Sequence, residues 1–335
     1  MASAREPIRD IAHLGHVELL TPKPAESLWY FTELLGMAVV HREGPSVYLR
    51  GYGDDAATTL KLTEAPAAGV GHVAWRAVSP AALERRAQAI EAAGLGIGWS
   101  NGDFGHGRCY RFHDPEGHVM EVYFEEQKYQ APEALRSTLM NMPMKYPGHG
   151  IGVRRSDHLA LLCQDVAANR AFMEDALGAQ LREQIRVEDG AVELGSWMST
   201  TAVHHEIAYV IDRKAGDARL HHFALWVDNR DDVLRAADIF MENGIFIEAG
   251  PSRHNNSQAF YLYSYEPGGN RIEVYTSGFF VFAPDFEPVI WDENTRGGGV
   301  YWGAPLPESF MTYATPVIDD DAAAPDRDLP PVDPR

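Results

Sequence analysis

The sequence is poor in cysteine and has no long apolar run. Its two cysteines, Cys109 and Cys163, are too few for a disulfide framework, and this usage is typical of a reducing compartment. No apolar stretch approaches the roughly 20 residues of a transmembrane helix. The first ten residues, MASAREPIRD, also lack the apolar segment of a secretory signal. These absences predict a cytoplasmic protein with no membrane partner.

Basic residues are scarce as well. The 335 residues include 29 Lys and Arg against 48 Asp and Glu, which gives a formal net charge of −19. Binding to a phosphate backbone needs clustered cations, so no nucleic-acid partner is expected. An apolar content of 45% and a charged content of 23% are ordinary for a globular protein, and the length favours two domains.

Six landmarks of the first half recur in the second half at a nearly constant spacing. The pairs are His16 and His158 and Gly36 and Gly178 at 142 residues, His72 and His222 and Gly94 and Gly244 at 150, and Pro115 and Pro267 and Glu121 and Glu273 at 152. A spacing this regular over so many positions indicates an internal duplication.

Within each half, helical and strand patterns alternate in the same order. The apolar period predicts helices over residues 24–35, 80–93, 166–177 and 231–243, and short apolar runs predict strands over 13–20, 46–50, 58–62, 71–78, 118–124, 157–162, 220–227 and 271–275. The predicted fold class is α+β, with four βαβββ modules in two duplicated halves. Each half is expected to form an incomplete β-barrel with its helices outside.

The duplication also sets the expected domains. Residues 1–145 are predicted to form an N-terminal two-module domain without an active metal, and residues 146–315 a C-terminal two-module catalytic domain. Residues 316–335 are rich in Pro, Ala and Asp. Because such a segment has little apolar surface to bury, it is predicted to be a disordered tail.

Three strands of the second half carry residues that are typical metal ligands. Glu273 lies in the strand after a tight turn at 267–270, and His158 and His222 lie in two other apolar strands. Two imidazoles and one carboxylate on one face of a metal leave three neighbouring positions open, as in non-haem Fe(II) oxygenases. Mn(II) and Zn(II) accept the same ligands, so these residue types do not fix the metal.

Several motifs around these residues resemble one enzyme family. They are Leu220-His221-His222, Gly250 to His254, Phe260 to Tyr263, Gly269 to Glu273, Trp302-Gly303 and Ser309 to Thr312. Together they resemble the type I extradiol ring-cleaving dioxygenases of the vicinal oxygen chelate superfamily, and in particular the catechol 2,3-dioxygenases and their homoprotocatechuate relatives. The resemblance covers almost the whole chain.

The resemblance implies a function and a set of roles. It implies that O2 cleaves a catechol ring beside one of its hydroxyls, giving a 2-hydroxymuconic semialdehyde, and that the protein is a homotetramer. The metal ligands implied for Fe(II), with Mn(II) as the alternative, are His158, His222 and Glu273, and the implied catalytic residues are His205, His254 and Tyr263. His205 is preferred to the adjacent His204 because Trp197 lies eight residues before it.

Substrate choice is partly indicated by the same comparison. Trp197 and Phe260 are candidate walls of the ring pocket. The homoprotocatechuate branch carries an arginine five residues before the position of His254, and here that place is Ala249. Without a bidentate cation a substrate carboxylate would be poorly compensated, although Arg296 could substitute. Catechol and its alkyl or chloro derivatives are therefore favoured over acid-bearing catechols.

The first half poses the question of a duplicate metal site. It keeps the three ligand types at the duplicated positions, His16, His72 and Glu121. Arg111 stands where the second half has Tyr263, and Gly102 stands where it has His254. A cation at the tyrosine position opposes a divalent metal, so the first-half residues are predicted to be structural remnants.

Two other classes of function stay open at this point. One is a different vicinal oxygen chelate enzyme, such as a glyoxalase or a fosfomycin-modifying transferase, which would not need Tyr263 and His254. The other is a metal-free binding protein of the same fold, like the bleomycin-sequestering proteins, which the three intact ligand residues disfavour.

Overall fold

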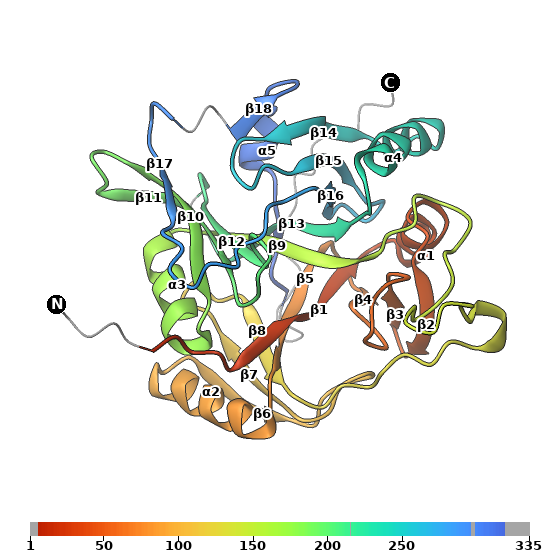
Figure 1. The fold of residues 1–335 in the computed structure, drawn as a ribbon, viewed down its shortest axis with the longest axis horizontal. Helices are drawn as coiled ribbons and strands as arrows, with labels where there is room; N and C mark the ends of the chain where they lie inside the picture. Colours follow the sequence, from red (N-terminus) through yellow and green to blue (C-terminus); the bar gives the residue numbers. More distant parts are fainter. Residues whose placement is uncertain (1–5, 215, 296–298, 319–335) are drawn as a thin grey trace.

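The computed structural model describes residues 6–214, 216–295 and 299–318, and these residues form two mixed sheets (Figure 1). One sheet has eight strands in the order β2-β3-β4-β1-β5-β8-β7-β6. The other has eleven, in the order β17-β10-β11-β12-β9-β13-β16-β15-β14-β18 with β19 beside β13. Each sheet is open at its ends and belongs to one half of the chain, which confirms the predicted duplication.

The four βαβββ modules are also confirmed. The first half consists of β1 (Ile11–Thr21), α1 (Pro24–Trp29), η1 (Tyr30–Leu34), β2 (Ala38–Glu43), β3 (Ser46–Arg50) and β4 (Leu60–Glu64), then β5 (Gly69–Ala77), α2 (Pro80–Ala92), β6 (Gly96–Ser100), β7 (Cys109–His113) and β8 (Val119–Tyr123), with η2 (Glu133–Leu135) in the linker. The second half consists of β9 (Arg155–Cys163), α3 (Val166–Phe172), η3 (Met173–Leu177), β10 (Gln180–Val187), β11 (Val192–Ser199) and β12 (Ile207–Ile211), then β13 (Arg219–Trp226), α4 (Arg230–Glu242), β14 (Ile247–His254), β15 (Phe260–Tyr265) and β16 (Arg271–Thr276). The C-terminal additions are β17 (Val289–Trp291), β18 (Val300–Trp302), α5 (Glu308–Thr312) and β19 (Thr315–Pro316).

Local sequence signals explain where the helices begin and end. The Ser79 side chain accepts a hydrogen bond from the backbone N–H of Ala82 at 3.1 Å and so caps α2. Gly178 follows η3 with φ = 77°, a left-handed conformation that glycine adopts without strain. One detail differs from prediction, because the helices expected over 24–35 and 166–177 each finish in a π-helical turn, η1 and η3.

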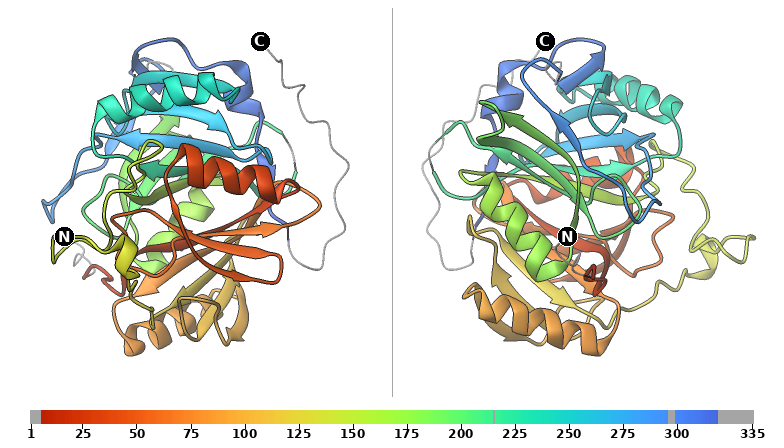
Figure 2. Two further views of the ribbon diagram at one scale, coloured as in Figure 1. Left: turned by 90° about the vertical axis from the view of Figure 1, so that its right-hand side faces the viewer. Right: turned by 60° about the vertical axis from the view of Figure 1, so that its left-hand side comes forward.

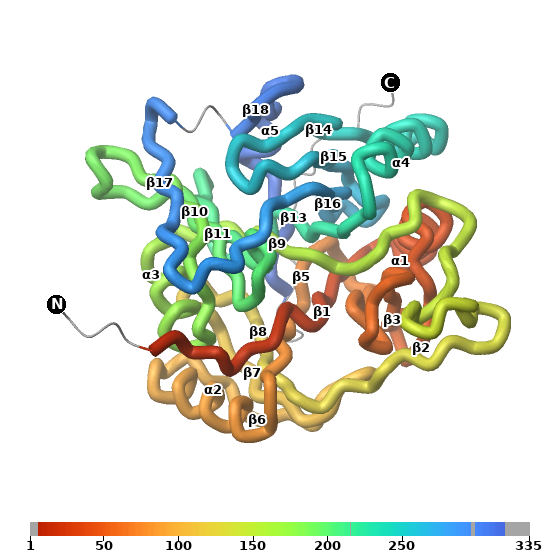
Figure 3. The backbone as a smooth tube through the Cα atoms, in the orientation of Figure 1, coloured from red at the N-terminus to blue at the C-terminus, as the bar shows by residue number. Residues whose placement is uncertain are grey.

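Each sheet has the same internal topology. In the first, β1 and β5 pair antiparallel at the centre, β4 runs parallel to β1, and β8 runs parallel to β5. In the second, β9, β13, β12 and β16 repeat this arrangement. Helices α2 and α4 lie at opposite ends of the molecule, each on the outside of its own sheet (Figure 2). The linker of residues 126–154 runs around the outside of the first half before it enters β9 (Figure 3).

The described chain ends at Ile318, inside the segment predicted to be a disordered tail. Strand β19 pairs with the start of β13, and the N–H of Val317 donates to the carbonyl oxygen of Ala218 at 3.1 Å. The predicted start of the tail is therefore wrong, because these residues complete the hydrogen bonding at one end of β13. The remainder of that segment, 319–335, lies outside the described residues.

Two further features concern the cysteines and the helices. Cys109 and Cys163 are both buried and free, as unpaired cysteines commonly are. Within the described ranges, no helix combines the length and the apolar character of a membrane-spanning segment.

A buried carboxylate joins the two halves. Asp114, in the turn before β8, accepts hydrogen bonds from the His118 ring at 2.7 Å and from the hydroxyl of Tyr209 at 2.8 Å. Burial raises the pKa of Asp114, but the His118 and Tyr209 contacts outweigh it and lower that pKa overall. Since Tyr209 belongs to β12, its hydroxyl ties the second half to a turn of the first.

We expect Tyr209→Phe to destabilise the protein by about 1–3 kcal/mol, because it removes one donor from a buried charged acceptor. Urea unfolding followed by circular dichroism measures this change. Tyr146→Phe is the matched control, since Tyr146 is 47% exposed and its hydroxyl reaches only the Ile151 carbonyl at 3.4 Å. Equal midpoints for the two variants would contradict a stabilising role of the contact.

Candidate metal centre

Strand register places three side chains of the second half on one face of the sheet. Ala224 on β13 pairs with His158 on β9 at one side and with Glu273 on β16 at the other. Residues directly opposite each other point to the same face, and so do residues two apart on one strand. His222 therefore joins His158 and Glu273 above the small methyl group of Ala224.

The three side chains converge to ligand distance. His158 Nε2 lies 2.9 Å and His222 Nε2 lies 3.2 Å from Glu273 Oε2, and the two nitrogens are 3.4 Å apart. Metal bonds of about 2.0–2.2 Å meeting at right angles give ligand separations of about 3 Å. These three buried groups therefore have the spacing of one face of a six-coordinate metal.

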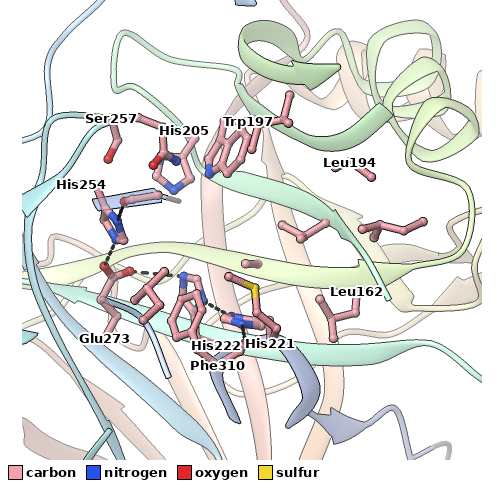
Figure 4. A pocket seen from close by; sticks show the side chains of 18 of the residues that line it. Leu162, Leu194, Trp197, His205, His221, His222, His254, Ser257, Glu273 and Phe310 are labelled. Atoms are coloured by element: carbon pink, nitrogen blue, oxygen red, sulfur yellow. Dashed lines mark hydrogen bonds and ion pairs between the residues drawn. The ribbon is translucent and has the colours of Figure 1, made fainter. Parts of the chain in front are cut away.

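Hydrogen bonds behind the two imidazoles fix which nitrogen carries the proton. His158 Nδ1 lies 2.7 Å from the carboxylate of Asp157, so Nδ1 is the donor. His221 Nε2 donates to the Phe310 carbonyl at 2.7 Å, which leaves His221 Nδ1 as an acceptor for His222 Nδ1 at 2.6 Å. Both Nε2 atoms then present lone pairs to the carboxylate, as in metal sites where a second hydrogen bond orients the ligand. Figure 4 shows the contacts that run from His221 through His222 to Glu273.

Acceptors that face each other this closely require a proton or a cation between them. Burial lowers the pKa of His158, but its hydrogen bonds to Asp157 and Glu273 outweigh burial and raise that pKa to about 9. Burial lowers the pKa of His222 to about 4. Glu273 also has one oxygen, Oε1, without a hydrogen-bond partner. These residues fit a divalent cation, which would satisfy all of these lone pairs at once.

A cavity of about 490 Å³ opens above the three groups. Its walls are largely apolar and include Ile185, Leu194, Trp197 and Val210. The predicted residues His205, His254 and Tyr263 line it as well. Its shape and lining suit a small aromatic molecule held by a few polar groups.

His254 and Tyr263 form a hydrogen-bonded pair beside Glu273. His254 Nδ1 donates to the Gly299 carbonyl at 2.9 Å, so its Nε2 accepts from the hydroxyl of Tyr263 at 3.1 Å. Tyr263 on β15 is the direct cross-strand partner of Glu273. Burial raises the pKa of Tyr263 well above its usual value, so this hydroxyl keeps its proton.

His205 lies on the other side of the metal centre. Its ring centre is 3.9 Å from that of His158, and Trp197 lies next to it on the cavity wall (Figure 4). Burial lowers the pKa of His205 well below its usual value, so the ring is neutral. The adjacent His204 faces Glu183 instead, at 3.5 Å, and is not among the described residues that line the cavity.

Two residues predicted for the substrate pocket lie elsewhere. Phe260 belongs to the main hydrophobic core, because it alternates with Tyr261 and Tyr263 on β15 and so points to the opposite face. Ala249 packs in a separate small cluster with Tyr263. Neither is among the described residues that line the cavity, and Arg296 lies outside the described residues.

The sequence reasoning missed the residues that orient the candidate ligands. Asp157 and His221 each directly precede a candidate ligand, and Phe310 contributes only a backbone carbonyl from α5. The Asp157-His158 and His221-His222 pairs were visible as adjacent metal-binding residue types. The carbonyl of Phe310 carries no signal of its own, since every residue has one.

Comparisons with known proteins place the chain in a family. The family model described as the Glyoxalase/Bleomycin resistance protein/Dioxygenase superfamily matches residues 13–122 and 155–274. Metapyrocatechase from Geobacillus stearothermophilus is 45% identical over 96% of this chain and 98% of its own. The manganese-dependent 2,3-dihydroxybiphenyl 1,2-dioxygenase from Geobacillus genomosp. 3 is 39% identical over 88% of this chain and 95% of its own. A substrate complex of homoprotocatechuate 2,3-dioxygenase from Brevibacterium fuscum superposes with a TM-score of 0.82 at 28% identity, over 95% of this chain and 97% of that one.

We expect Ala224→Leu to lose most of the metal bound at His158 and Glu273. A larger side chain would enter the space between the two ligands. The overpacking would also lower the free energy of unfolding by about 1–3 kcal/mol. Metal content of the purified protein, with circular dichroism to confirm folding, measures the effect. Ala236→Leu is the matched control, because Ala236 is a fully buried alanine on α4 that packs in the main core and touches neither histidine cluster. Full metal retention at the second-half site in Ala224→Leu would contradict the proposed convergence.

Proposed function

We propose that this chain, which belongs to the Glyoxalase/Bleomycin resistance protein/Dioxygenase superfamily, is a catechol 2,3-dioxygenase. It binds one Fe(II) through His158, His222 and Glu273 and uses O2 to open the ring of catechol, or of an alkyl or chloro derivative, beside one hydroxyl. The product is a 2-hydroxymuconic semialdehyde. The observation that carries the proposal is the pair of buried Nε2 lone pairs that face the Glu273 carboxylate at the floor of an apolar cavity.

The choice of iron is part of the proposal. The 2-His-1-carboxylate set suits non-haem Fe(II). Mn(II) is the alternative, because the similar dioxygenase from Geobacillus genomosp. 3 is manganese-dependent. When bound, the metal supplies neighbouring positions for both catechol oxygens and for O2, and it lowers the pKa of a bound hydroxyl.

The chain's own residues would manage the protons. The hydroxyl of Tyr263 and the ring of His254 form one hydrogen-bonded unit beside Glu273, which suits them to hold the substrate oxygens and to accept a catechol proton. His205 is neutral and lines the cavity beside His158. It is suited to take up a proton released by the catechol and to return it on the oxygen side as the bond between the oxygen atoms breaks.

The cavity lining supports a substrate without a carboxylate. Leu162, Ile185 and Leu194 are among its apolar walls. Among the described residues that line it, the one lysine or arginine is Arg213, which is exposed. An ionised carboxylate deep in the cavity would therefore lack a bidentate partner. The comparison of catechol with 3,4-dihydroxyphenylacetate tests this choice.

Location and assembly complete the proposal. Two free, buried cysteines are consistent with the cytoplasm. A homotetramer is proposed from the family resemblance, and light scattering of the purified protein tests it.

Anaerobic loading with Fe(II), followed by catechol and air, tests the activity directly. We expect a yellow ring-opened product, and a higher kcat/KM for catechol and 3-methylcatechol than for 3,4-dihydroxyphenylacetate. A preference for the acid would overturn the substrate assignment alone. An iron-loaded protein that cleaves none of these catechols would overturn the enzyme assignment.

We predict that Glu273→Gln will nearly abolish ring cleavage and the iron bound at His158 and His222. The neutral amide of Gln lacks the negative charge with which the Glu273 carboxylate would bind a cation between the two imidazoles. Iron analysis after identical Fe(II) loading is the measurement. Glu121→Gln, at the equivalent place in the first half, should keep its iron. Full iron retention in Glu273→Gln would sink the ligand assignment.

Substitutions of His205 and of Tyr263 should slow different steps of the reaction. General acid–base help is worth about 100- to 10,000-fold in rate. We therefore expect His205→Asn to keep its iron and bind catechol but to be slowed in steps that follow O2 addition, and Tyr263→Phe to be slowed in later proton transfers. Rapid mixing of the anaerobic catechol complex with O2 distinguishes the two. His204→Asn is the control, and a larger loss there than in His205→Asn would move the role to His204.

A further inference from the structure

A second group of histidines surrounds a buried carboxylate in the first sheet. Ala74 on β5 pairs with His16 on β1 and with Glu121 on β8, which repeats the register of Ala224 in the second sheet. His72, two residues before Ala74, shares their face. The fourth member, His106, comes from the loop between β6 and β7, and no landmark of the duplication pointed to it.

Three of the four side chains lie mutually at ligand distance, and His72 lies close to two of them. The ligand atoms of His16, His106 and Glu121 all lie within 4.8 Å of one another. Glu121 Oε1 is 3.3 Å from His106 Nε2, 3.6 Å from His16 Nε2 and 3.7 Å from His72 Nε2, and the last two nitrogens are 2.9 Å apart. These values bracket the edge of about 3.3 Å in a tetrahedron whose metal–ligand bonds are about 2.0–2.1 Å.

Two of these atoms are buried and unsatisfied. His106 Nδ1 donates to the Gly107 carbonyl at 2.9 Å, so its Nε2 carries a lone pair directed at Glu121 Oε1. Neither His106 Nε2 nor Glu121 Oε1 has a hydrogen-bond partner, and the two side chains are 2% and 5% exposed. Leaving two acceptors face to face in a protein interior costs free energy, and a cation between them removes that cost.

The surrounding hydrogen bonds orient the other groups toward the same point. His72 Nδ1 donates to Glu18 at 2.8 Å, and Lys61 holds Glu18 in turn at 3.1 Å, so His72 Nε2 also faces inward as an acceptor. The thiol of Cys109 donates to Glu121 Oε2 at 3.1 Å and leaves Oε1 for the cluster. Carboxylate–histidine pairs of this kind are typical supports of metal ligands.

We propose that the first half binds a divalent metal of the Zn²⁺ class through His16, His106 and Glu121, with His72 as the fourth ligand. Three of these ligands are mutually close and His72 Nε2, 3.7 Å from Glu121 Oε1, can complete a tetrahedral shell, so we assign the site a structural rather than a catalytic role. It joins β1, β5, β8 and the loop that carries His106, and thereby ties the two modules of this half together. Arg111 was the reason to expect no metal in this half. It is the cross-strand neighbour of Glu121, but among the described residues no ion pair joins the two side chains.

Metal counting on the full chain tests the proposal. The purified protein is stripped with a chelator, loaded with Co²⁺ in place of both metals, and analysed for bound metal per chain. We expect two ions in the parent, one in Glu273→Gln, and one in His106→Ala. The ion left in Glu273→Gln should give the intense visible absorption of tetrahedral Co²⁺. His41→Ala is the matched control, since His41 stacks on Phe104 of the same loop and lies outside the cluster, and it should keep two.

The outcome does not depend on whether the His106 variant folds. If it does not fold, the Glu273→Gln protein decides alone, and one tetrahedral Co²⁺ per chain supports the site while none overturns it. Two ions in a folded His106→Ala protein would also overturn it. We further expect the metal in Glu273→Gln to raise the thermal midpoint of unfolding, since a ligand that binds only the folded state stabilises it. The failure of iron binding or of ring cleavage in the parent leaves this result unaffected.

Discussion

The register between a central antiparallel strand pair and one parallel neighbour decides where chemistry can occur in this chain. In each half an alanine lies between a histidine on one strand and a glutamate on another. A shift of a single residue would turn all of these side chains to the opposite face. The duplicated fold therefore places a polar cluster on the same face of each sheet, and the loops around each cluster determine how they differ.

Because these clusters are buried, each of their polar groups needs a hydrogen-bond partner or a counter-charge. A carboxylate without water is stable only when it is paired and hydrogen-bonded. Around Glu273, Asp157 and the Phe310 carbonyl fix the imidazole protons on the far side of the rings, so the near side offers only lone pairs. In the second half the remaining space is a cavity, which suits a metal that must also accept substrate. In the first half His106 lies 3.3 Å from Glu121, which suits a metal held mainly by protein ligands.

The sequence predicted much of this arrangement, and the misses have physical causes. The constant spacing between His16 and His158 and between Glu121 and Glu273 indicated the duplication, because ligand-bearing strands keep their register when a module is copied. His106 could not be found in this way, since a loop residue has no fixed register. Phe260 does not line the cavity because it alternates with Tyr261 and Tyr263 along β15 and so points to the opposite face. The composition of the segment that begins at Pro316 gave no signal for its backbone pairing with Arg219 of β13.

The hydrogen bond from His221 to Phe310 has a consequence for the order in which the site is completed. All three proposed iron ligands precede α5 in the chain, yet the carbonyl that fixes the proton on His221, and through it the proton on His222, is synthesised about 35 residues after Glu273. A nascent chain that has exposed every ligand still has His222 free to present either nitrogen. The protonation of His222 is therefore fixed when α5 docks, and not when His158, His222 and Glu273 first meet.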